Sequence, residues 1–387
     1  MIGLATWYNN LMRYFLARDA ALKWLETPAV YHIQNDELYE LDEASFAFFE
    51  SCTSEKGCAS RDSAFLDYSL EEGLISTERS PVPQPKLKKA PAPSLRYLEL
   101  QITDACNLRC KHCYIEDSHN AELPLDRIRL VLKEFEDMQG LRLLITGGEP
   151  LLHSAFNDVN AMLPEFSFRK ILFTNGLALP AQDLGGLNVH EIQLSIDGLE
   201  KAHDALRGQG TFTRTIDAAT RALDAGFDVS ISTMVHPENF EDFDGMERLF
   251  RSMKIKDWTV DVPCLTGRLK DNADFQVLPE EGGKYLGYGF GGGLHSSGAG
   301  FGCGLHLMSV LADGRAAKCT FYADRAVGSV DEGLRTCWQR VRPVPLASLT
   351  CDCSYLEACR GGCRFRAELL SGKNGKDLYR CALYGIE

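Results

Sequence analysis

The chain has 387 residues, of which 45% are hydrophobic and 25% are charged, as in an ordinary globular protein. No apolar run approaches the ~20 residues of a membrane span, and the N-terminus lacks a signal peptide's basic flank and apolar core. We therefore expect a cytoplasmic protein that does not bind a membrane. The net charge of −13 has the wrong sign for a protein that binds nucleic acid by neutralising phosphates.

Residues 1–80 predict a small winged-helix-like domain. Residues 29–34 and 37–42 flank an Asn35-Asp36 turn and alternate as in a β-hairpin. Residues 43–52 and 60–75 follow with helical apolar spacing, the second helix with Asp62 or Ser60 as its cap. Five prolines between residues 80 and 94 favour an extended spacer, so residues 81–94 are predicted to be a linker.

From residue 95 to residue 268 the pattern changes to alternating strands and helices, which predicts an α/β fold with a helix-covered parallel sheet. Helical stretches such as 125–138 and 213–226 separate the strands. Six units are too few for the eight of a closed barrel, so we expect a partial (β/α)6 TIM-like barrel. The six predicted strands are residues 95–102, 142–146, 170–174, 191–196, 228–235 and 258–263.

Residues 269–302 form a glycine-rich segment between this barrel and a cysteine-rich C-terminal region, residues 303–387. Eleven glycines between residues 282 and 304 exclude a long regular element. Two interpretations remain open: a flexible connector, or a loop that shapes a substrate channel.

Fourteen cysteines in a reducing compartment are better explained as metal ligands than as disulfides. Cys106, Cys110 and Cys113 lie in CNLRCKHC at the end of the first barrel strand, where strand–helix barrels build active sites. Three thiolates can hold three irons of a 4Fe-4S cluster and leave the fourth iron without a protein ligand. The alternative is a zinc site that His112 completes.

The segment CNLRCKHCY resembles the signature of the radical S-adenosylmethionine (SAM) enzymes, and later strand ends match that superfamily over roughly residues 95–268. The resemblance implies that the GGEP turn meets the methionine amino group of SAM, that Ser195 and Asp197 lie near its ribose, that Arg207 binds its carboxylate, and that Tyr114 lies against its adenine. Ordinary turn chemistry, strand-end capping, a surface ion pair and packing are the respective alternatives. The predicted SAM contacts are Tyr114, Gly147, Gly148, Glu149, Pro150, Asn175, Ser195, Asp197 and Arg207.

The C-terminal cysteines resemble those of the SPASM domain, although only Asp352 separates a pair that two residues usually separate. The resemblance implies two auxiliary 4Fe-4S clusters, three clusters in all. The inner one has only three assigned thiolates, so its fourth iron is open or is closed by Cys264 or Cys337. A zinc-ribbon-like domain is the alternative. The implied ligands are Cys351, Cys353, Cys359 and Cys381 for the outer cluster, and Cys303, Cys319 and Cys363 for the inner one.

The hairpin and helices of about residues 25–78 resemble the PqqD-like domain that recognises precursor peptides, in which a leader peptide adds a strand to the sheet edge. A DNA-binding winged helix is the alternative, but residues 1–90 carry nine Lys and Arg against fourteen Asp and Glu.

These resemblances predict an oxidoreductase, a radical SAM/SPASM maturase of a ribosomally made peptide (RiPP). It would remove hydrogen through a 5′-deoxyadenosyl radical and install a thioether or carbon–carbon cross-link. A reductase such as flavodoxin or ferredoxin is the expected electron donor, and no residue is assigned as the catalytic acid or base. The alternatives are an enzyme of the anaerobic sulfatase-maturating type, which oxidises a Cys or Ser of a protein, and an iron–sulfur winged-helix regulator.

Overall fold

The computed structural model describes residues 12–80, 84–116, 118–292 and 298–386. Parts of the predicted N-terminal domain, linker and glycine-rich segment (residues 1–11, 81–83 and 293–297) lie outside the described residues, as do residues 117 and 387. No helix among the described residues has the length and apolar character needed to cross a membrane.

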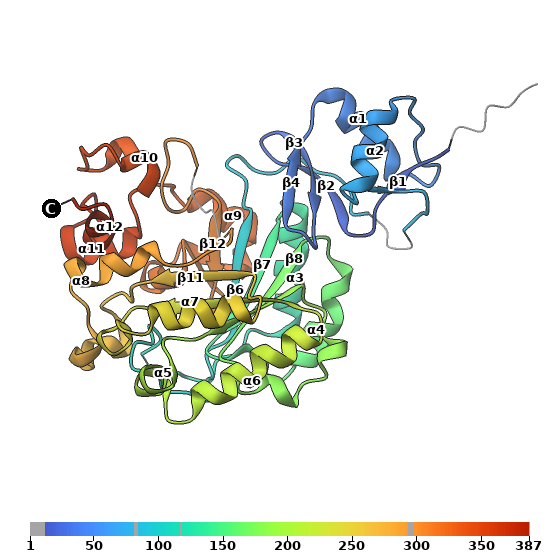
Figure 1. Ribbon diagram of the computed structural model, residues 1–387. Helices are drawn as coiled ribbons and strands as arrows, with labels where there is room; N and C mark the ends of the chain where they lie inside the picture. Colours follow the sequence, from blue (N-terminus) through green and yellow to red (C-terminus); the bar gives the residue numbers. More distant parts are fainter. Residues whose placement is uncertain (1–11, 81–83, 117, 293–297, 387) are drawn as a thin grey trace, which may run out of the picture.

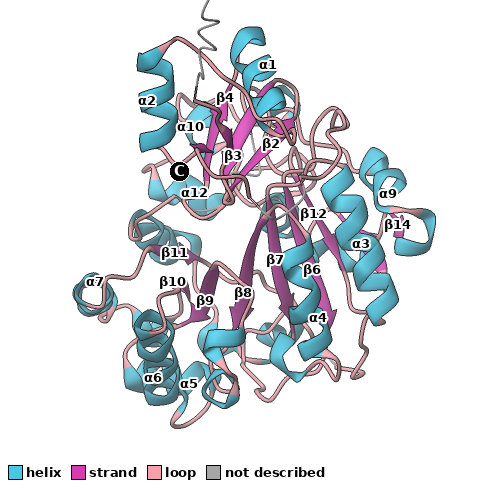
Figure 2. Cartoon of the chain, turned by 90° about the vertical axis from the view of Figure 1, so that its right-hand side faces the viewer, coloured by secondary structure: helices cyan, strands magenta, loops and turns pink. Residues whose placement is uncertain are grey.

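A nine-stranded sheet forms the centre of the molecule (Figures 1 and 2). Six of its strands follow one another in chain order, each parallel to the next, which confirms the predicted α/β fold with an open partial barrel. These strands are β6 (Tyr97–Thr103), β7 (Arg142–Gly147), β8 (Arg169–Thr174), β9 (Glu191–Ser195), β10 (Asp228–Met234) and β11 (Asp257–Asp261).

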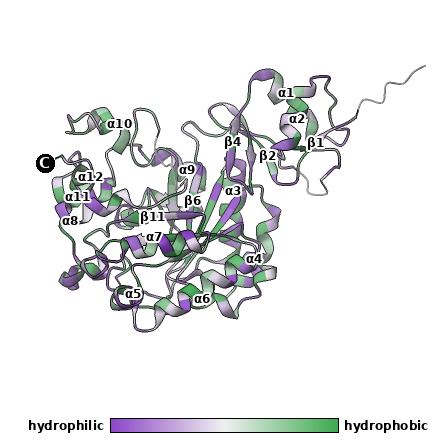
Figure 3. Cartoon of the chain, in the orientation of Figure 1, coloured by the Kyte–Doolittle hydropathy of each residue, from purple (hydrophilic) through white to green (hydrophobic). Residues whose placement is uncertain are grey.

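Helices cover the outer face of this sheet. In α3, Ile128, Val131, Leu132 and Phe135 are buried at helical spacing, so one face of the helix rests on the strands. Figure 3 shows hydrophobic and hydrophilic residues alternating along α6 and α7, as expected for helices with one wet face. Only short 3-10 turns join β8 to β9. The covering helices are α3 (Leu125–Asp137), α4 (Phe156–Met162), α5 (Glu200–Arg207), α6 (Thr211–Asp224) and α7 (Phe243–Ser252).

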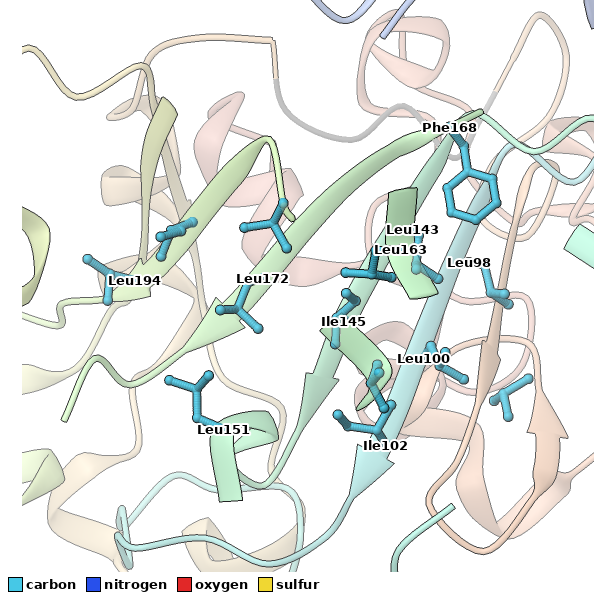
Figure 4. Close-up of a cluster of buried hydrophobic side chains, with 14 of the residues drawn as sticks. Leu98, Leu100, Ile102, Leu143, Ile145, Leu151, Leu163, Phe168, Leu172 and Leu194 are labelled. Carbon is cyan, nitrogen blue, oxygen red and sulfur yellow. The ribbon is translucent and has the colours of Figure 1, made fainter. Parts of the chain in front are cut away.

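The two faces of the barrel strands differ in polarity. Leu98, Leu100 and Ile102 alternate along β6 and pack beside Leu143 and Ile145 of β7 in the main hydrophobic core (Figure 4). The alternate positions of the strands are more polar, and they line cavities inside the barrel. A parallel sheet buried on both faces is normally apolar throughout, so this alternation marks an interior that holds more than a packed core.

The sheet continues beyond the six strands that the sequence predicted. Strand β12 (Leu307–Val310), from the cysteine-rich region, pairs parallel to β6, and β13 (Arg315–Ala317) and β14 (Gly328–Ser329) follow in antiparallel fashion. The strand β12 therefore covers an edge of β6 that would otherwise be unpaired.

The N-terminal residues form an antiparallel sheet of β2 (Ala20–Trp24), β3 (Pro28–His32) and β4 (Glu37–Glu40), a short pair of β1 (Phe15–Leu16) and β5 (Ile75–Ser76), and two helices. The predicted β3–β4 hairpin and both helices are confirmed. Helix α1 (Glu43–Cys52) begins after Asp42 and α2 (Ser63–Glu71) after Asp62, whose carboxylates accept hydrogen bonds from backbone N–H groups of the first turn. The sequence reading missed β1, β2 and β5.

Both faces of β3 are buried, because its second face packs on the barrel. Val30 lies in the core between the sheet and the helices, whereas Tyr31 and Ile33 pack with Leu141, next to the start of β7. The ammonium of the buried Lys23 donates to the carbonyl oxygens of Gly140 (2.9 Å) and Ser167 (2.8 Å).

The turn of this hairpin meets the N-terminal ends of the barrel strands. Asp36 pairs with Arg142 (2.6 Å), the first residue of β7. Arg169, the first residue of β8, donates to the carbonyl oxygens of Ile33 (3.1 Å) and Gln34 (2.5 Å). The N-terminal sheet is thus joined to the barrel by buried polar bonds as well as by apolar packing.

Two segments predicted to be connectors are partly packed. In the proline-rich segment, the Ala90 N–H donates to the Trp24 carbonyl oxygen (2.8 Å). In the glycine-rich segment, the rings of Tyr285 and Tyr288 pack against Phe243 of α7. The remaining C-terminal helices are short: α8 (Pro279–Gly282), α9 (Leu334–Arg340), α10 (Leu356–Cys359), α11 (Arg364–Ser371) and α12 (Leu378–Leu383).

Candidate active site

A cavity of about 300 Å³ lies at the C-terminal ends of the barrel strands. Its wall includes most of the residues that the sequence singled out, although they come from four strand ends and one helix. Glu149, Pro150 and Asp197 are the predicted site residues of the barrel that are not part of this wall. Those that line it are Cys106, Cys110, Cys113, Tyr114, Gly147, Gly148, Asn175, Ser195 and Arg207.

The cysteine loop is held from the far edge of the barrel by Gly267 and Arg268. Nε of Arg268 donates to the Cys110 carbonyl oxygen (3.1 Å), and its backbone N–H donates to that of Cys113 (3.0 Å). Gly267 has a φ of 54°, and a Cβ there would overlap the carbonyl oxygens of Cys113 and Tyr114. The sequence reading missed both residues, since their role depends on a contact across the barrel mouth.

The paired glycines of GGEP allow close backbone packing within the barrel. A Cβ on Gly147 would lie 2.5 Å from the Thr103 carbonyl oxygen, and one on Gly148 would overlap the carbonyl oxygens of Asp104 and Ala105. Glycine is therefore needed to bring this turn against the residues that lead into the cysteine loop.

The carboxylate of Glu149 is buried behind the turn. It accepts hydrogen bonds from Oγ1 of Thr174 (2.7 Å) and from the backbone N–H of Asn175 (2.8 Å). Burial raises the pKa of Glu149 to about 7, although both donors favour the ionised form. Glu149 thus ties the end of β7 to the end of β8.

Asp197 is fully buried and supports Arg207. Its carboxylate pairs with Nε of Arg207 and accepts a hydrogen bond from the Met234 N–H (2.7 Å). Burial alone would raise the pKa of Asp197, but the nearby Arg207 and His112 bring it down to about 2. Arg207 therefore reaches the cavity as a cation whose Nε edge is already in use, with Nη1 3.8 Å from the Cys110 sulfur.

Among the neighbours of the cysteine loop, Asn175 donates from Nδ2 to Oδ1 of Asn107 (2.7 Å) and lies 3.9 Å from the Cys106 sulfur. The ring of Tyr114 lies 5.3 Å from that of Phe321, between centroids. Glu99, which the sequence reading did not select, also lines the cavity and accepts hydrogen bonds from Oγ of Ser309 and the Thr320 N–H (3.3 Å). Burial raises the pKa of Glu99, which favours the uncharged acid.

These residues fit an iron–sulfur cluster together with SAM. Burial raises the pKa of the Cys106 thiol to about 11 and also raises that of Cys110. At Cys110 the nearby Arg207 cation lowers the pKa, so the pocket supplies positive charge where a thiolate must form. Among the described residues, no three Cys, His, Asp or Glu side chains meet closely enough to hold a single metal ion.

A second cavity, of about 490 Å³, occupies the other half of the barrel interior. The Asn35-Asp36 turn forms part of its wall, as do Gly291 and Gly292 of the glycine-rich segment. The two cavities share Phe173, Gln193 and Ser232 as wall residues.

The C-terminal cysteines form two groups. Cys351, Cys353, Cys359 and Cys381, the cysteines expected at the outer cluster, all line one small pocket. The cysteines expected at the inner cluster lie together elsewhere: burial raises the pKa of Cys319 well above its usual range, and the sulfurs of Cys303 and Cys363 raise it further.

Comparisons with known proteins agree with this geometry. Residues 100–250 match the Radical SAM superfamily. The AdoMet-dependent heme synthase of Nitratidesulfovibrio vulgaris is 27% identical over 202 residues, 50% of this chain and 55% of the relative. The GTP 3′,8-cyclase of Edwardsiella ictaluri is 34% identical over 154 residues, 37% of this chain and 46% of the relative. The chain thus spans about half the length of the curated relatives it matches.

Solved structures match over more of the chain. Streptococcus suis SuiB bound to the precursor peptide SuiA has a TM-score of 0.64 at 15% identity, covering 94% of this chain and 98% of SuiB. The structure of anSMEcpe with bound AdoMet and Cp18Cys peptide has a TM-score of 0.56 at 17% identity, covering 74% of this chain and 94% of that one. At these identities the likeness concerns the fold.

The superfamily match begins within β6 and ends within α7, so it includes the cysteine loop and most strand ends of the cavity. SAM and a 4Fe-4S cluster are the cofactors that this domain implies. Residues 100–250 of the chain, which carry the cysteine loop and most of the cavity wall, are therefore similar to the Radical SAM superfamily.

Proposed function

We propose that this enzyme is a radical SAM/SPASM maturase that installs a thioether or carbon–carbon cross-link in a ribosomally made precursor peptide. The observation that carries the proposal is the match along 94% of the chain to SuiB, whose structure holds a precursor peptide. The two cysteine groups near the C-terminus support it, as does the small N-terminal sheet, in which β4 is an edge strand.

In this proposal Cys106, Cys110 and Cys113 hold the first cluster. Such a cluster would supply the electron that cleaves a carbon–sulfur bond of SAM to give methionine and a 5′-deoxyadenosyl radical, chemistry that removes hydrogen from an unactivated carbon. Arg207, held by Asp197, offers a fixed cation for the SAM carboxylate. Phe173, Met234, Pro263 and Phe321 give the cavity an apolar wall that excludes water from a reactive species.

The edge of β4 is the proposed docking site of the leader peptide. Strand β4 pairs with β3 on one side, and among the described residues no strand pairs with its other side. A strand with a free edge is suited to accept an added peptide strand. Next to it, Tyr39 donates a hydrogen bond to Glu72 (2.7 Å), and the half-exposed Tyr68 lies against the Tyr39 ring. This acidic and aromatic surface favours a leader with basic and apolar residues.

The position of β4 also limits the peptide's path. The β3–β4 turn contacts the first residues of β7 and β8, whereas the cavity lies at the opposite ends of these strands. Six residues of strand span about 20 Å, so at least ~6 extended residues must separate the docked leader from the modified residue.

Mass spectrometry of a candidate precursor incubated with the anaerobically reconstituted enzyme, SAM and a reductant tests the proposal. A short precursor encoded beside the gene is the first substrate to try. The expected result is the loss of two hydrogen masses per cross-link together with 5′-deoxyadenosine, neither of which appears with the Cys106→Ala/Cys110→Ala/Cys113→Ala variant. 5′-Deoxyadenosine without any change in peptide mass would contradict the assigned substrate.

An enzyme of the sulfatase-maturating type is the second candidate, supported by the likeness to anSMEcpe, whose structure holds a Cp18Cys peptide. Fragmentation of the product peptide separates the two: oxidation of a single Ser also removes two hydrogens, but it leaves no link between two residues.

A further inference from the structure

A fourth cysteine lies with the three that are expected at the inner auxiliary cluster. The side chain of Cys264 is hydrogen-bonded to that of Cys363. The sulfur of Cys363 also lies close enough to those of Cys303 and Cys319 to interact with them electrostatically. Cys264, three residues beyond the end of β11, thus belongs to this group in space although it precedes Cys303 by 39 residues.

The contact between Cys264 and Cys363 is held by a buried arginine. Nη1 of Arg366, in α11, donates to Oδ1 of Asp261 (2.7 Å) and to the Val262 carbonyl oxygen (2.9 Å). Its Nε and Nη2 donate to the two carboxylate oxygens of Asp377 (3.0 and 2.8 Å). Because Arg366 is 2% exposed and all its nitrogens are in use, it fixes the start of α11 against the end of β11.

The residues that flank the other two members, Gly304 beside Cys303 and Lys318 beside Cys319, are in close contact. The loop that begins at Cys303 passes over the residue that precedes Cys319, since a Cβ on Gly304 would overlap Cε of Lys318. Gly304 has a φ of 86°, which glycine adopts without strain.

Cys337, the other unassigned cysteine considered for this role, lies elsewhere. It is fully buried in the main hydrophobic core with Leu334 and Trp338, and its thiol donates to the Ser329 carbonyl oxygen (3.2 Å). The charged groups that act on Cys337 are Glu332, Arg340 and Glu134, whereas those that act on Cys303 and Cys319 include other cysteines.

We propose that Cys264 is the fourth ligand of the inner auxiliary cluster, so that Cys264, Cys303, Cys319 and Cys363 hold a 4Fe-4S cluster with thiolate at every iron. This inference rests on the auxiliary clusters of the proposed function. Cys264 also lines the cavity at the first cluster. The inner cluster therefore lies beside the wall of the reaction cavity, yet offers no vacant iron to a substrate sulfur. A role in which that cluster binds a substrate thiol is excluded by this assignment.

The test uses the full chain carrying Cys106→Ala, Cys110→Ala and Cys113→Ala, so that only the C-terminal cysteines bind clusters. Iron, sulfide and the EPR spectrum of the reduced protein are compared for this parent, for the added Cys264→Ala or Cys264→Ser, and for the added Cys337→Ala. Cys337→Ala is the matched control because both cysteines are buried. β-Mercaptoethanol serves as the probe for an open iron.

We expect the parent and Cys337→Ala to show the same spectrum with and without the added thiol. Cys264→Ala should either lose one cluster's worth of iron, about four per chain, or gain a spectrum that shifts with β-mercaptoethanol. Cys264→Ser, which keeps the size of the side chain, should alter the spectrum while retaining the fold by circular dichroism.

A Cys264→Ala protein with the iron content and thiol-insensitive spectrum of the parent would overturn the assignment, as would a parent spectrum that itself shifts with the thiol. Equal iron loss in Cys264→Ala and Cys337→Ala would also overturn it, since a packing defect would then explain both. No peptide enters the experiment, so the result is independent of whether the peptide substrate proves correct.

Discussion

Arg268 ties the end of the sixth barrel strand to the cysteine loop that follows the first strand, because its Nε donates to the Cys110 carbonyl oxygen at 3.1 Å. Its Nη1 also donates to the Glu116 carbonyl oxygen (3.3 Å). A loop with three thiols and little regular structure thereby gains a fixed position across the barrel mouth.

Replacing Arg268 by Met should weaken the first cluster. The variant keeps the aliphatic stem but loses two charge-assisted hydrogen bonds, and a loss of about 1.4 kcal/mol corresponds to about tenfold faster release of iron to a chelator. Chelation kinetics followed by absorbance measure it. The exposed Arg248→Met variant is the control, and equal rates for both would show that Arg268 does not hold the loop.

Replacing Asp197 by Asn should weaken SAM binding although Asp197 does not line the cavity. The amide oxygen of the new Asn can still accept the hydrogen bond from the Met234 N–H. The amide carries no charge to balance the buried Arg207, so the guanidinium group is no longer held in one orientation. We expect the Kd for SAM, measured by equilibrium dialysis, to rise about tenfold, since each 1.4 kcal/mol is a factor of ten. Asp217→Asn breaks an exposed pair with Arg221 and should leave the Kd unchanged.

The triple variant Cys106→Ala/Cys110→Ala/Cys113→Ala should form no 5′-deoxyadenosine while keeping the iron of the C-terminal clusters. The reason is that the two C-terminal cysteine groups draw no ligand from the loop that the variant changes. Chromatography of the products measures 5′-deoxyadenosine, and iron analysis measures the iron that the C-terminal clusters retain. Continued SAM cleavage by this protein would refute the role of the loop.

Glu149 should make stability depend on pH in a defined direction. Its pKa rises on folding from 4.5 to about 7, so its contribution is fully present below pH 4.5 and is lost as the pH rises through 7. The shift corresponds to about 3 kcal/mol, at 1.36 kcal/mol per pKa unit. Glu149→Gln keeps the shape of the side chain without the charge, so its Tm should fall less than that of the wild type between pH 5 and pH 8. Identical losses in the two proteins would contradict the assigned pKa.

Charge reversal beside the β4 edge should weaken leader binding. Glu40 is exposed at the end of β4, and Glu40→Lys would repel the basic leader that the acidic surface favours. We expect a several-fold higher Kd by fluorescence anisotropy with a labelled leader peptide, and unproductive SAM cleavage at the wild-type rate. Glu50→Lys, an equal charge change on α1, is the control. Point variants are preferable to deletion of the N-terminal residues, which would leave Arg142 without Asp36.

The barrel follows closely from local pattern. All six predicted strands lie within a few residues of the observed ones, since alternating apolar residues such as Leu98, Leu100 and Ile102 can be buried only on one face of a strand. The cysteine loop and the strand-end motifs also lie where the order of the strands requires, because parallel strands bring their C-terminal ends to one edge.

The orientation and hydrogen-bond partners of individual motif residues did not follow from their spacing. Glu149 and Asp197 are predicted from the sequence to contact SAM, and the structure adds that both carboxylates are buried and hold other residues in place. Whether a polar side chain at a strand end faces the cavity depends on the backbone of the turn that carries it, and a motif does not contain that information.

The amino-acid sequence alone determined the order of the barrel strands, the three-cysteine loop and the two sets of C-terminal cysteines, because these depend on residue type and on separation along the chain. Only the tertiary structure decided that Arg268 binds the cysteine loop, that Cys264 rather than Cys337 lies with the inner cysteines, and that β12 completes the edge of β6. The physical reason is that each of these contacts joins segments that are distant in sequence, and their approach is set by packing of the whole barrel.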